Sequence, residues 1–110
     1  MKKGEIWIVD IPQSESHEQS GKRPVVLVAR LEANMAMVIP CTSNQNALRF
    51  PHTVSIDSTV RNGLSELSIA LVFQLRAIDQ KRLKKKIGVL QKSLLEKVDG
   101  MMSEMLGLKN

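Results

Sequence analysis

Short runs of β-branched and other apolar residues, separated by polar or turn-forming stretches, recur along the first 90 positions, and a single helical pattern follows them. We expect strands over residues 4–10, 24–30, 35–40, 53–56, 68–74 and 87–90. Loops or turns are expected over residues 11–22, 32–34, 41–48 and 57–66. Many short strands with one terminal helix predict a small, strongly bent antiparallel barrel of the SH3-like kind, as one domain spanning residues 1–110.

The terminal helix is the clearest single element in the pattern. Ser93 and Glu96 have the spacing of a capping box, in which each side chain pairs with a free backbone N–H of the first turn. Apolar residues then recur on one face at helical spacing: Leu94, Leu95, Val98, Met101, Met102, Met105 and Leu106. Gly107 is expected to end the helix.

Charge favours a polyanionic partner. The net charge is +5 and the isoelectric point is near 9.7, which is typical of a chain that binds nucleic acid. Residues 76–86 form a charged segment that is expected to begin with a helical turn at residues 79–81, and its densest basic run is Lys81-Arg82 with Lys84-Lys85-Lys86. This run is either a solvated face or a surface that steers RNA. Arg49, Arg61 and Arg76 are further candidates for groove charge.

Nothing in the sequence favours secretion or membrane insertion. Cys41 is the one cysteine, so an intramolecular disulfide is excluded. The apolar run after the basic start stops at Asp10, and no run approaches the roughly 18 apolar residues of a membrane span. We therefore expect a cytoplasmic protein without a membrane segment.

A polar loop ends in an arginine that is fixed against a proline. Pro24 restricts Arg23 to extended geometry at the start of a predicted strand, and His17 and Glu18 precede it in the same loop. A guanidinium binds phosphate oxygens and stays charged, whereas histidine or glutamate can move a proton. These are the groups that phosphodiester cleavage requires. The alternative for Arg23 is a salt bridge at the start of the strand.

Four segments follow one another in a characteristic order. They are Gly4-Glu5-Ile6-Trp7 with Val9-Asp10, His17-Glu18-Gln19-Ser20-Gly21-Lys22-Arg23-Pro24, Ile39-Pro40-Cys41-Thr42-Ser43, and Gln74-Leu75-Arg76-Ala77-Ile78-Asp79 with Arg82-Leu83 and Ile87-Gly88-Val89-Leu90. Together they resemble the MazF/PemK family of toxin–antitoxin endoribonucleases. The resemblance implies an SH3-like barrel that works as a homodimer, cleaves single-stranded RNA without a metal or other cofactor, and is neutralised by an antitoxin.

In such metal-free cleavage the ribose 2′-hydroxyl attacks the adjacent phosphorus, leaving a 2′,3′-cyclic phosphate and a 5′-hydroxyl. The resemblance assigns charge stabilisation, and proton donation to the leaving oxygen, to Arg23. Thr42 either binds a phosphoryl oxygen or closes its own turn, and Ser43 is a lesser candidate for the same work. His17 has the side chain suited to act as the base. Glu18, shared with the family, acts as the base, orients Arg23 or holds the loop.

We expect further RNA contacts from Gln19, Lys22, Ser43, Phe50, Phe73, Gln74 and Arg76. Phe50 either stacks on an RNA base or simply packs against other side chains of the protein. Phe73 departs from the family pattern, because many relatives have an aspartate before the residue that matches Gln74. In some relatives this aspartate has an acid–base role, which a phenyl ring cannot fill. Either that role is not essential, or residues of the first loop have taken it over, or this chain is catalytically impaired. Phe73 can instead stack on a base.

Two other functions stay open beside a sequence-selective endoribonuclease toxin. One is a CcdB-like gyrase inhibitor, which shares the barrel and binds a protein. The other is a degenerate family member that only binds its antitoxin. Arg23-Pro24 and Thr42-Ser43 favour the nuclease, whereas Phe73 keeps the inhibitor open. The nuclease hypothesis requires Arg23 and Thr42 to face a shared cavity.

Overall fold

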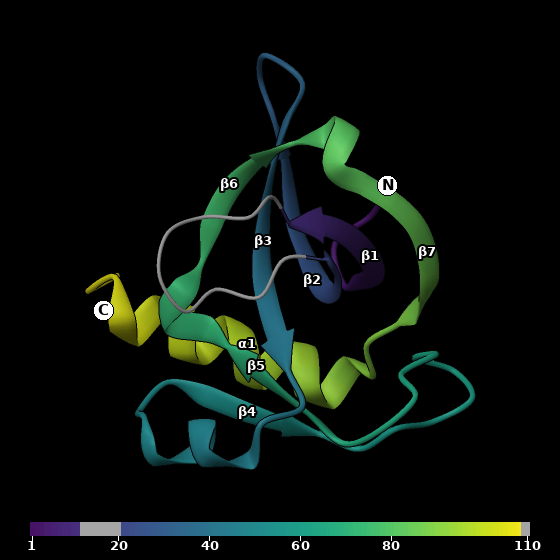
Figure 1. Cartoon of the computed structure of the whole chain (residues 1–110). Coiled ribbons are helices and arrows are strands. Elements are labelled where there is room, and N and C mark those ends of the chain that lie inside the picture. The colour runs from purple at the N-terminus through teal and green to yellow at the C-terminus, as the bar shows by residue number, and fades with distance from the viewer. Residues whose placement is uncertain (12–20, 109–110) are drawn as a thin grey trace.

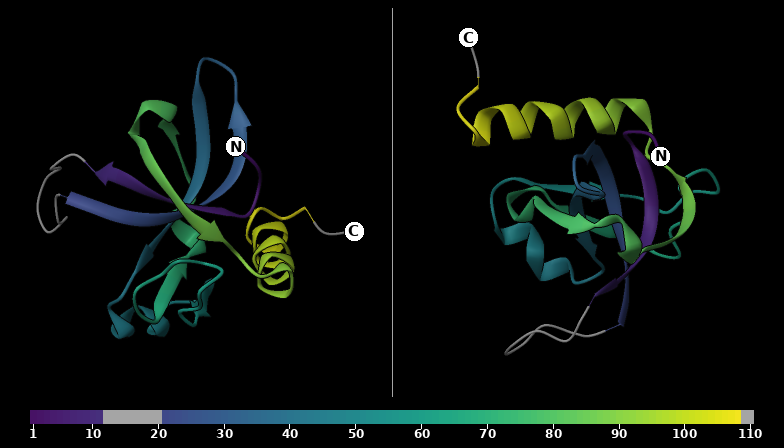
Figure 2. Two further views of the ribbon diagram at one scale, coloured as in Figure 1. Left: turned by 90° about the vertical axis from the view of Figure 1, so that its right-hand side faces the viewer. Right: turned by 90° about the horizontal axis from the view of Figure 1, so that it is seen from above.

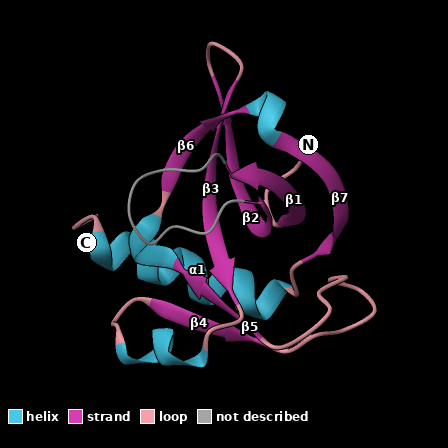
Figure 3. Ribbon diagram, viewed as in Figure 1, coloured by secondary structure: helices cyan, strands magenta, loops and turns pink. Residues whose placement is uncertain are grey.

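The computed structural model describes residues 1–11 and 21–108 (Figure 1). Its strands are β1 (Glu5–Ile11), β2 (Gly21–Leu31), β3 (Met35–Thr42), β4 (Thr53–Ile56), β5 (Ser68–Leu71), β6 (Arg76–Asp79) and β7 (Leu83–Val89). Short 3₁₀ helices are η1 (Gln45–Arg49), η2 (Val72–Gln74) and η3 (Gln80–Arg82), and the α-helix is α1 (Lys92–Met105) (Figure 3). The predicted fold class, mainly antiparallel β with a C-terminal helix, is confirmed.

The strands form one strongly bent antiparallel sheet in the order β4-β5-β3-β2-β1-β7. β3 pairs with β5 near its end and with β6 near its start, while β2 lies along its other edge. The segment from β6 through η3 to β7 arches over the central strands (Figure 1). Within the described residues no ladder joins β7 back to β4 or β6, so the sheet is barrel-like without closing.

Alternating side chains of the central strands build a core on each face of the sheet. Ile6, Val26 and Ile39 belong to one buried cluster, which packs against the apolar face of α1. Val9 and Val25 belong to a second cluster on the opposite face. Helix α1 therefore lies across one side of the sheet (Figure 2). In the part of the chain that the structure describes, no helix has both the length and the apolar character needed to span a membrane.

The predicted start of the helix is wrong and its predicted end is confirmed. The N-cap is Gln91, which makes no side-chain capping bond, and Ser93 lies inside the first turn, where its Oγ accepts a bond from Gln91 Nε2 at 2.9 Å. At the other end Gly107 has a φ of +70°, and its N–H donates to Glu104 O at 3.2 Å. Leu108 N–H donates to a carbonyl one turn back, which completes a Schellman motif.

The charged stretch before the helix hides two strands. β6 was not predicted, and β7 begins at Leu83 rather than at residue 87. The lysines over residues 84–86 are exposed on this edge strand, and such charge masks the apolar alternation of a strand. The expected helical turn is present as η3, where Asp79 Oδ1 accepts from Lys81 N–H at 2.9 Å. The strand predicted over residues 68–74 ends at Leu71, where η2 follows.

A buried carboxylate joins the first strand to the last. Glu5 is 7% exposed, accepts a hydrogen bond from Trp7 Nε1 at 2.9 Å, and lies 3.3 Å from Lys86 Nζ. Burial by itself raises the pKa of Glu5, but hydrogen bonds from Trp7, the Lys2 backbone and Lys86 outweigh it and lower the pKa below its ordinary value. The ionised carboxylate thus stabilises the fold above that ordinary value, and the contribution is lost as the pH falls through the lowered pKa.

Candidate functional site

Arg23 and Thr42 lie together at one end of the two central strands. Arg23 is near the start of β2 and Thr42 is the last residue of β3. The antiparallel register pairs Val25 with Pro40, and continuing it by two residues sets Arg23 opposite Thr42. Both side chains are half-buried, and both line the same two cavities. Of the described residues that line these cavities, only Arg23 and Thr42 line both. The pair therefore marks the junction at which the two cavities meet.

The first cavity, of about 240 Å³, combines cations, amides and aromatic surface. Its polar lining beside the Arg23–Thr42 pair consists of Asn44, Asn46, Arg49 and Gln74. Phe50 and Phe73 form its aromatic side, with ring centroids 5.4 Å apart and planes tilted by 51°. The Arg49 guanidinium carbon lies 4.7 Å from the Phe50 centroid. Both rings stay about two-fifths exposed, at 41% and 39%, so solvent reaches the pair.

The second cavity, of about 390 Å³, is polar and has no aromatic residue among its described lining. Lys22, Pro24, Cys41 and Ser43 reach it from the strand residues next to Arg23 and Thr42. Successive side chains of a strand point to opposite faces, so this cavity takes its lining from the face opposite the pair as well as from the pair itself. Its far wall is the segment over residues 63–66, where Glu66 is the one carboxylate among the described lining residues.

Thr42 both closes its own turn and keeps a free donor. Its Oγ1 accepts from Asn44 N–H at 3.2 Å, and Asn44 Oδ1 in turn accepts from Asn46 N–H at 3.0 Å to cap η1. A hydroxyl that accepts one bond still has its own proton to donate. The two roles that the sequence allows for Thr42 are therefore compatible.

The remaining predicted residues divide into three groups. Phe50, Phe73 and Gln74 line the first cavity, and Lys22 and Ser43 line the second. Arg76 lies on β6, where it lines a separate cavity of about 390 Å³ over the second core cluster. His17, Glu18 and Gln19 lie outside the described residues.

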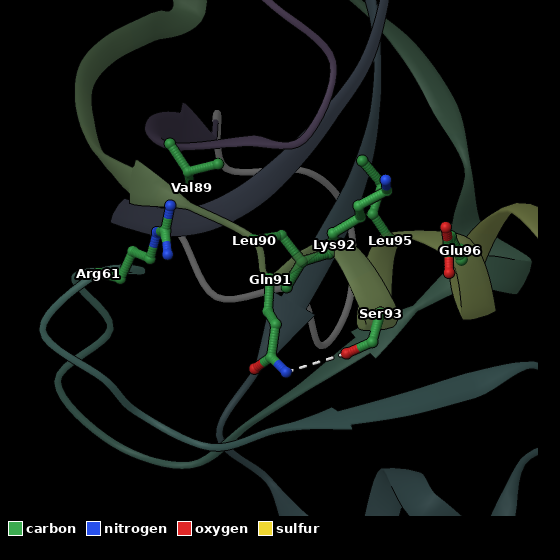
Figure 4. Close-up of a pocket in the computed structure, with 8 residues that line it drawn as sticks. All are labelled: Arg61, Val89, Leu90, Gln91, Lys92, Ser93, Leu95 and Glu96. Atoms are coloured by element: carbon green, nitrogen blue, oxygen red, sulfur yellow. Dashed lines mark hydrogen bonds between the residues drawn. The ribbon is translucent and has the colours of Figure 1, made fainter.

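Another predicted cation also lies apart from the pair. Arg61 lines a cavity of about 760 Å³ at the start of α1 (Figure 4). The close-up shows it across from the hydrogen-bonded Gln91 and Ser93, and none of the residues that form this cavity in the described structure belongs to the Arg23–Thr42 site.

Cys41 lines the second cavity but is not a nucleophile. Burial raises the pKa of its thiol to about 12, so the group stays protonated at neutral pH. Among residues 1–11 and 21–108, no group of three or more histidine, cysteine or acidic residues is arranged to hold a metal ion.

Sequence reasoning missed Asn44, Asn46 and Glu66. An asparagine that follows a strand and precedes a short helix is a recognisable N-cap signal, which could have identified Asn44. For Glu66 no local signal exists, because its position depends on how the segment over residues 57–66 packs against β7.

Comparison with known proteins gives consistent similarities. A family model described as PemK-like, MazF-like toxin of type II toxin–antitoxin system matches residues 2–106. "Endoribonuclease MazF" of Staphylococcus epidermidis is 31% identical over 114 aligned residues, which cover 100% of this chain and 94% of that protein.

Two solved structures share the fold. The MazE–MazF complex (Form-II) from Deinococcus radiodurans has a TM-score of 0.80 at 20% identity, covering 99% of this chain and 97% of that one. An endoribonuclease in complex with its cognate antitoxin from a mycobacterial species has a TM-score of 0.73 at 13% identity, covering 98% and 96%.

Proposed function

Because this chain belongs to the PemK-like, MazF-like toxin family of type II toxin–antitoxin systems, we propose that it is an endoribonuclease toxin whose Arg23 and Thr42 cleave single-stranded RNA without a metal ion. The observation that carries this assignment is the meeting of two cavities at the Arg23–Thr42 pair. A phosphodiester joins two nucleotides, so a reacting phosphate at the junction leaves one cavity for the nucleotide on each side.

The cleavage reaction needs one group that stabilises negative charge and two groups that transfer protons. The 2′-hydroxyl attacks phosphorus, the P–O5′ bond breaks, and negative charge gathers on the phosphoryl oxygens. Arg23 binds these oxygens as a cation, and the Thr42 hydroxyl donates a further bond to them. We assign the 2′-hydroxyl proton to Glu18 or His17, as predicted from the sequence, and the proton for the leaving 5′-oxygen to Arg23, which recovers it through solvent from the protonated base once the 5′-hydroxyl has formed.

Charge around the pair supports binding of a polyanion. Lys22 and Arg23 line the second cavity, and Arg49 lines the first together with Arg23. Residues 84–86 add exposed lysines on β7. Contacts of this kind release counterions from the nucleic acid, so RNA binding should weaken as the salt concentration rises.

The direct test is cleavage of a long single-stranded RNA in excess EDTA. We expect discrete fragments that carry a 2′,3′-cyclic phosphate at one end and a 5′-hydroxyl at the other. Polynucleotide kinase should label the new 5′ ends without prior phosphatase treatment. Cleavage that needs added Mg²⁺ would contradict the proposal, and growth arrest on expression without any RNA cleavage would favour the gyrase-inhibitor alternative.

We propose that Phe50 and Phe73 form a platform on which one base stacks. Replacing either ring with alanine should weaken RNA binding about 5- to 150-fold, the effect of removing one base–aromatic stack. Fluorescence anisotropy with a non-cleavable 2′-O-methyl RNA measures the Kd. Leu48→Ala is the matched control, because this side chain is also apolar and exposed, lies on η1 and is not part of the described cavity lining. Equal Kd values for the phenylalanine variants and wild type would refute the platform.

The relatives also indicate how the chain is controlled. In the Deinococcus structure MazF is bound to MazE, and in the mycobacterial structure the endoribonuclease is bound to its cognate antitoxin. We propose that a cognate antitoxin neutralises this chain as well, and that the chain works as a homodimer. Its proposed substrate is messenger RNA, so we place its action in the cytoplasm.

A further inference from the structure

The second cavity offers a means of choosing the base next to the cleaved bond. We propose that Glu66 recognises a base with an exocyclic amino group there, which favours cytosine, adenine or guanine over uracil. The inference rests on the proposed endoribonuclease function and adds a specificity-determining residue to it.

The two cavities at the Arg23–Thr42 junction differ in chemistry. The first presents the Phe50 and Phe73 rings, and stacking on such rings tolerates every base. The second presents hydroxyl groups, two cations and the Glu66 carboxylate. Hydrogen-bonding groups of this kind read the edges of bases, and amides in the first cavity can do so as well, but Glu66 is the one carboxylate among the described residues that line either cavity.

An ionised carboxylate only accepts hydrogen bonds. The amino groups at cytosine N4, adenine N6 and guanine N2 donate them, whereas uracil has no amino group and offers only its ring N3–H. Lys22 and Arg23 line the same cavity, so a carboxylate is tolerated there beside the phosphates of the substrate. Glu66 is exposed, so a ligand can reach its carboxylate, and this carboxylate pairs with none of the described basic residues.

The segment that carries Glu66 is held in place by Asn62. This side chain is 4% exposed, and its Oδ1 accepts from the N–H groups of Thr59 and Leu64, each at 3.0 Å. Its Nδ2 donates to Asp57 O at 2.8 Å. The adjoining Gly63 packs directly on the backbone of β7. A wall fixed in this way presents its carboxylate without the entropic cost of ordering a flexible loop.

Glu66→Gln tests the proposal, because the amide has nearly the same shape but turns one acceptor into a donor. RNAs with randomised nucleotides around one cleaved bond are digested and the products are sequenced. We expect wild type to cut substrates with uracil at one adjacent position at least about fivefold more slowly than the others, and the variant to lose most of that preference while it still cleaves. The matched control is Glu32→Gln, an exposed carboxylate in the turn at the far end of β2, which should change nothing.

Each outcome decides a separate point. An unchanged preference in a folded, cleaving Glu66→Gln variant would overturn the role of Glu66 and leave the nuclease intact. So would a wild-type enzyme that accepts uracil equally at both adjacent positions. A wild-type chain that cuts no RNA would overturn the proposed function, and this inference with it.

Discussion

Replacing Arg23 with alanine should lower the rate of RNA cleavage at least about 100-fold, which is the usual effect of removing one group that stabilises the charge of a transition state. Arg23 is half-buried between the two cavities. Of the other described residues, only Thr42 also lines both. No other described cation lies at that junction to take its place. Single-turnover cleavage of a fluorescent RNA in EDTA measures the loss.

Two further variants separate an effect on the cleavage step from an effect on the general electrostatic attraction of RNA. Arg23→Lys keeps the charge but loses the planar fork that binds two phosphate oxygens, so it should recover only part of the activity. Lys22→Ala removes the neighbouring exposed cation and should weaken binding, with most of the single-turnover rate retained at saturating RNA. If Arg23→Ala cleaves at the wild-type rate while folded, Arg23 has no catalytic role and the assignment fails.

Much of the candidate site could be predicted from the sequence because its signals are local. The proline after Arg23 marks the start of a strand, and Thr42 precedes a polar loop. The structure brings these two ends together because the intervening turn pairs β2 with β3 in antiparallel register. Glu66 was beyond such reasoning, since packing between distant segments places it. The roles predicted for His17 and Glu18 stay predictions, because both lie outside the described residues.

The errors in the predicted fold also occur where a local sequence pattern does not decide the structure. Serine followed three residues later by glutamate fits a capping box, but α1 begins one residue before Ser93, which leaves the serine inside the helix. Phe73 belongs to an apolar run that indicates a strand, yet the chain turns into η2 there. That turn sets Phe73 beside Phe50, as tertiary packing overrides local propensity.

The second large effect concerns stability and the wall that carries Glu66. Gly63 has a φ of +72°, and a Cβ added to it would lie 2.0 Å from the carbonyl oxygen of Ile87. Neither backbone can yield while the Val89 N–H bond to Arg61 O at 3.1 Å persists. Gly63→Ala must therefore push this segment away from β7.

We expect Gly63→Ala to lower the free energy of unfolding by about 3 kcal/mol, the sum of left-handed strain and steric overlap. Gly100→Ala is the matched control. An added Cβ meets nothing within 4 Å there, and alanine favours a helix over glycine, so stability should rise by up to about 1 kcal/mol. Urea unfolding followed by circular dichroism measures both values. Similar stabilities for the two variants would mean that Gly63 does not pack against β7 in solution, and the fixed wall behind Glu66 would be lost with it.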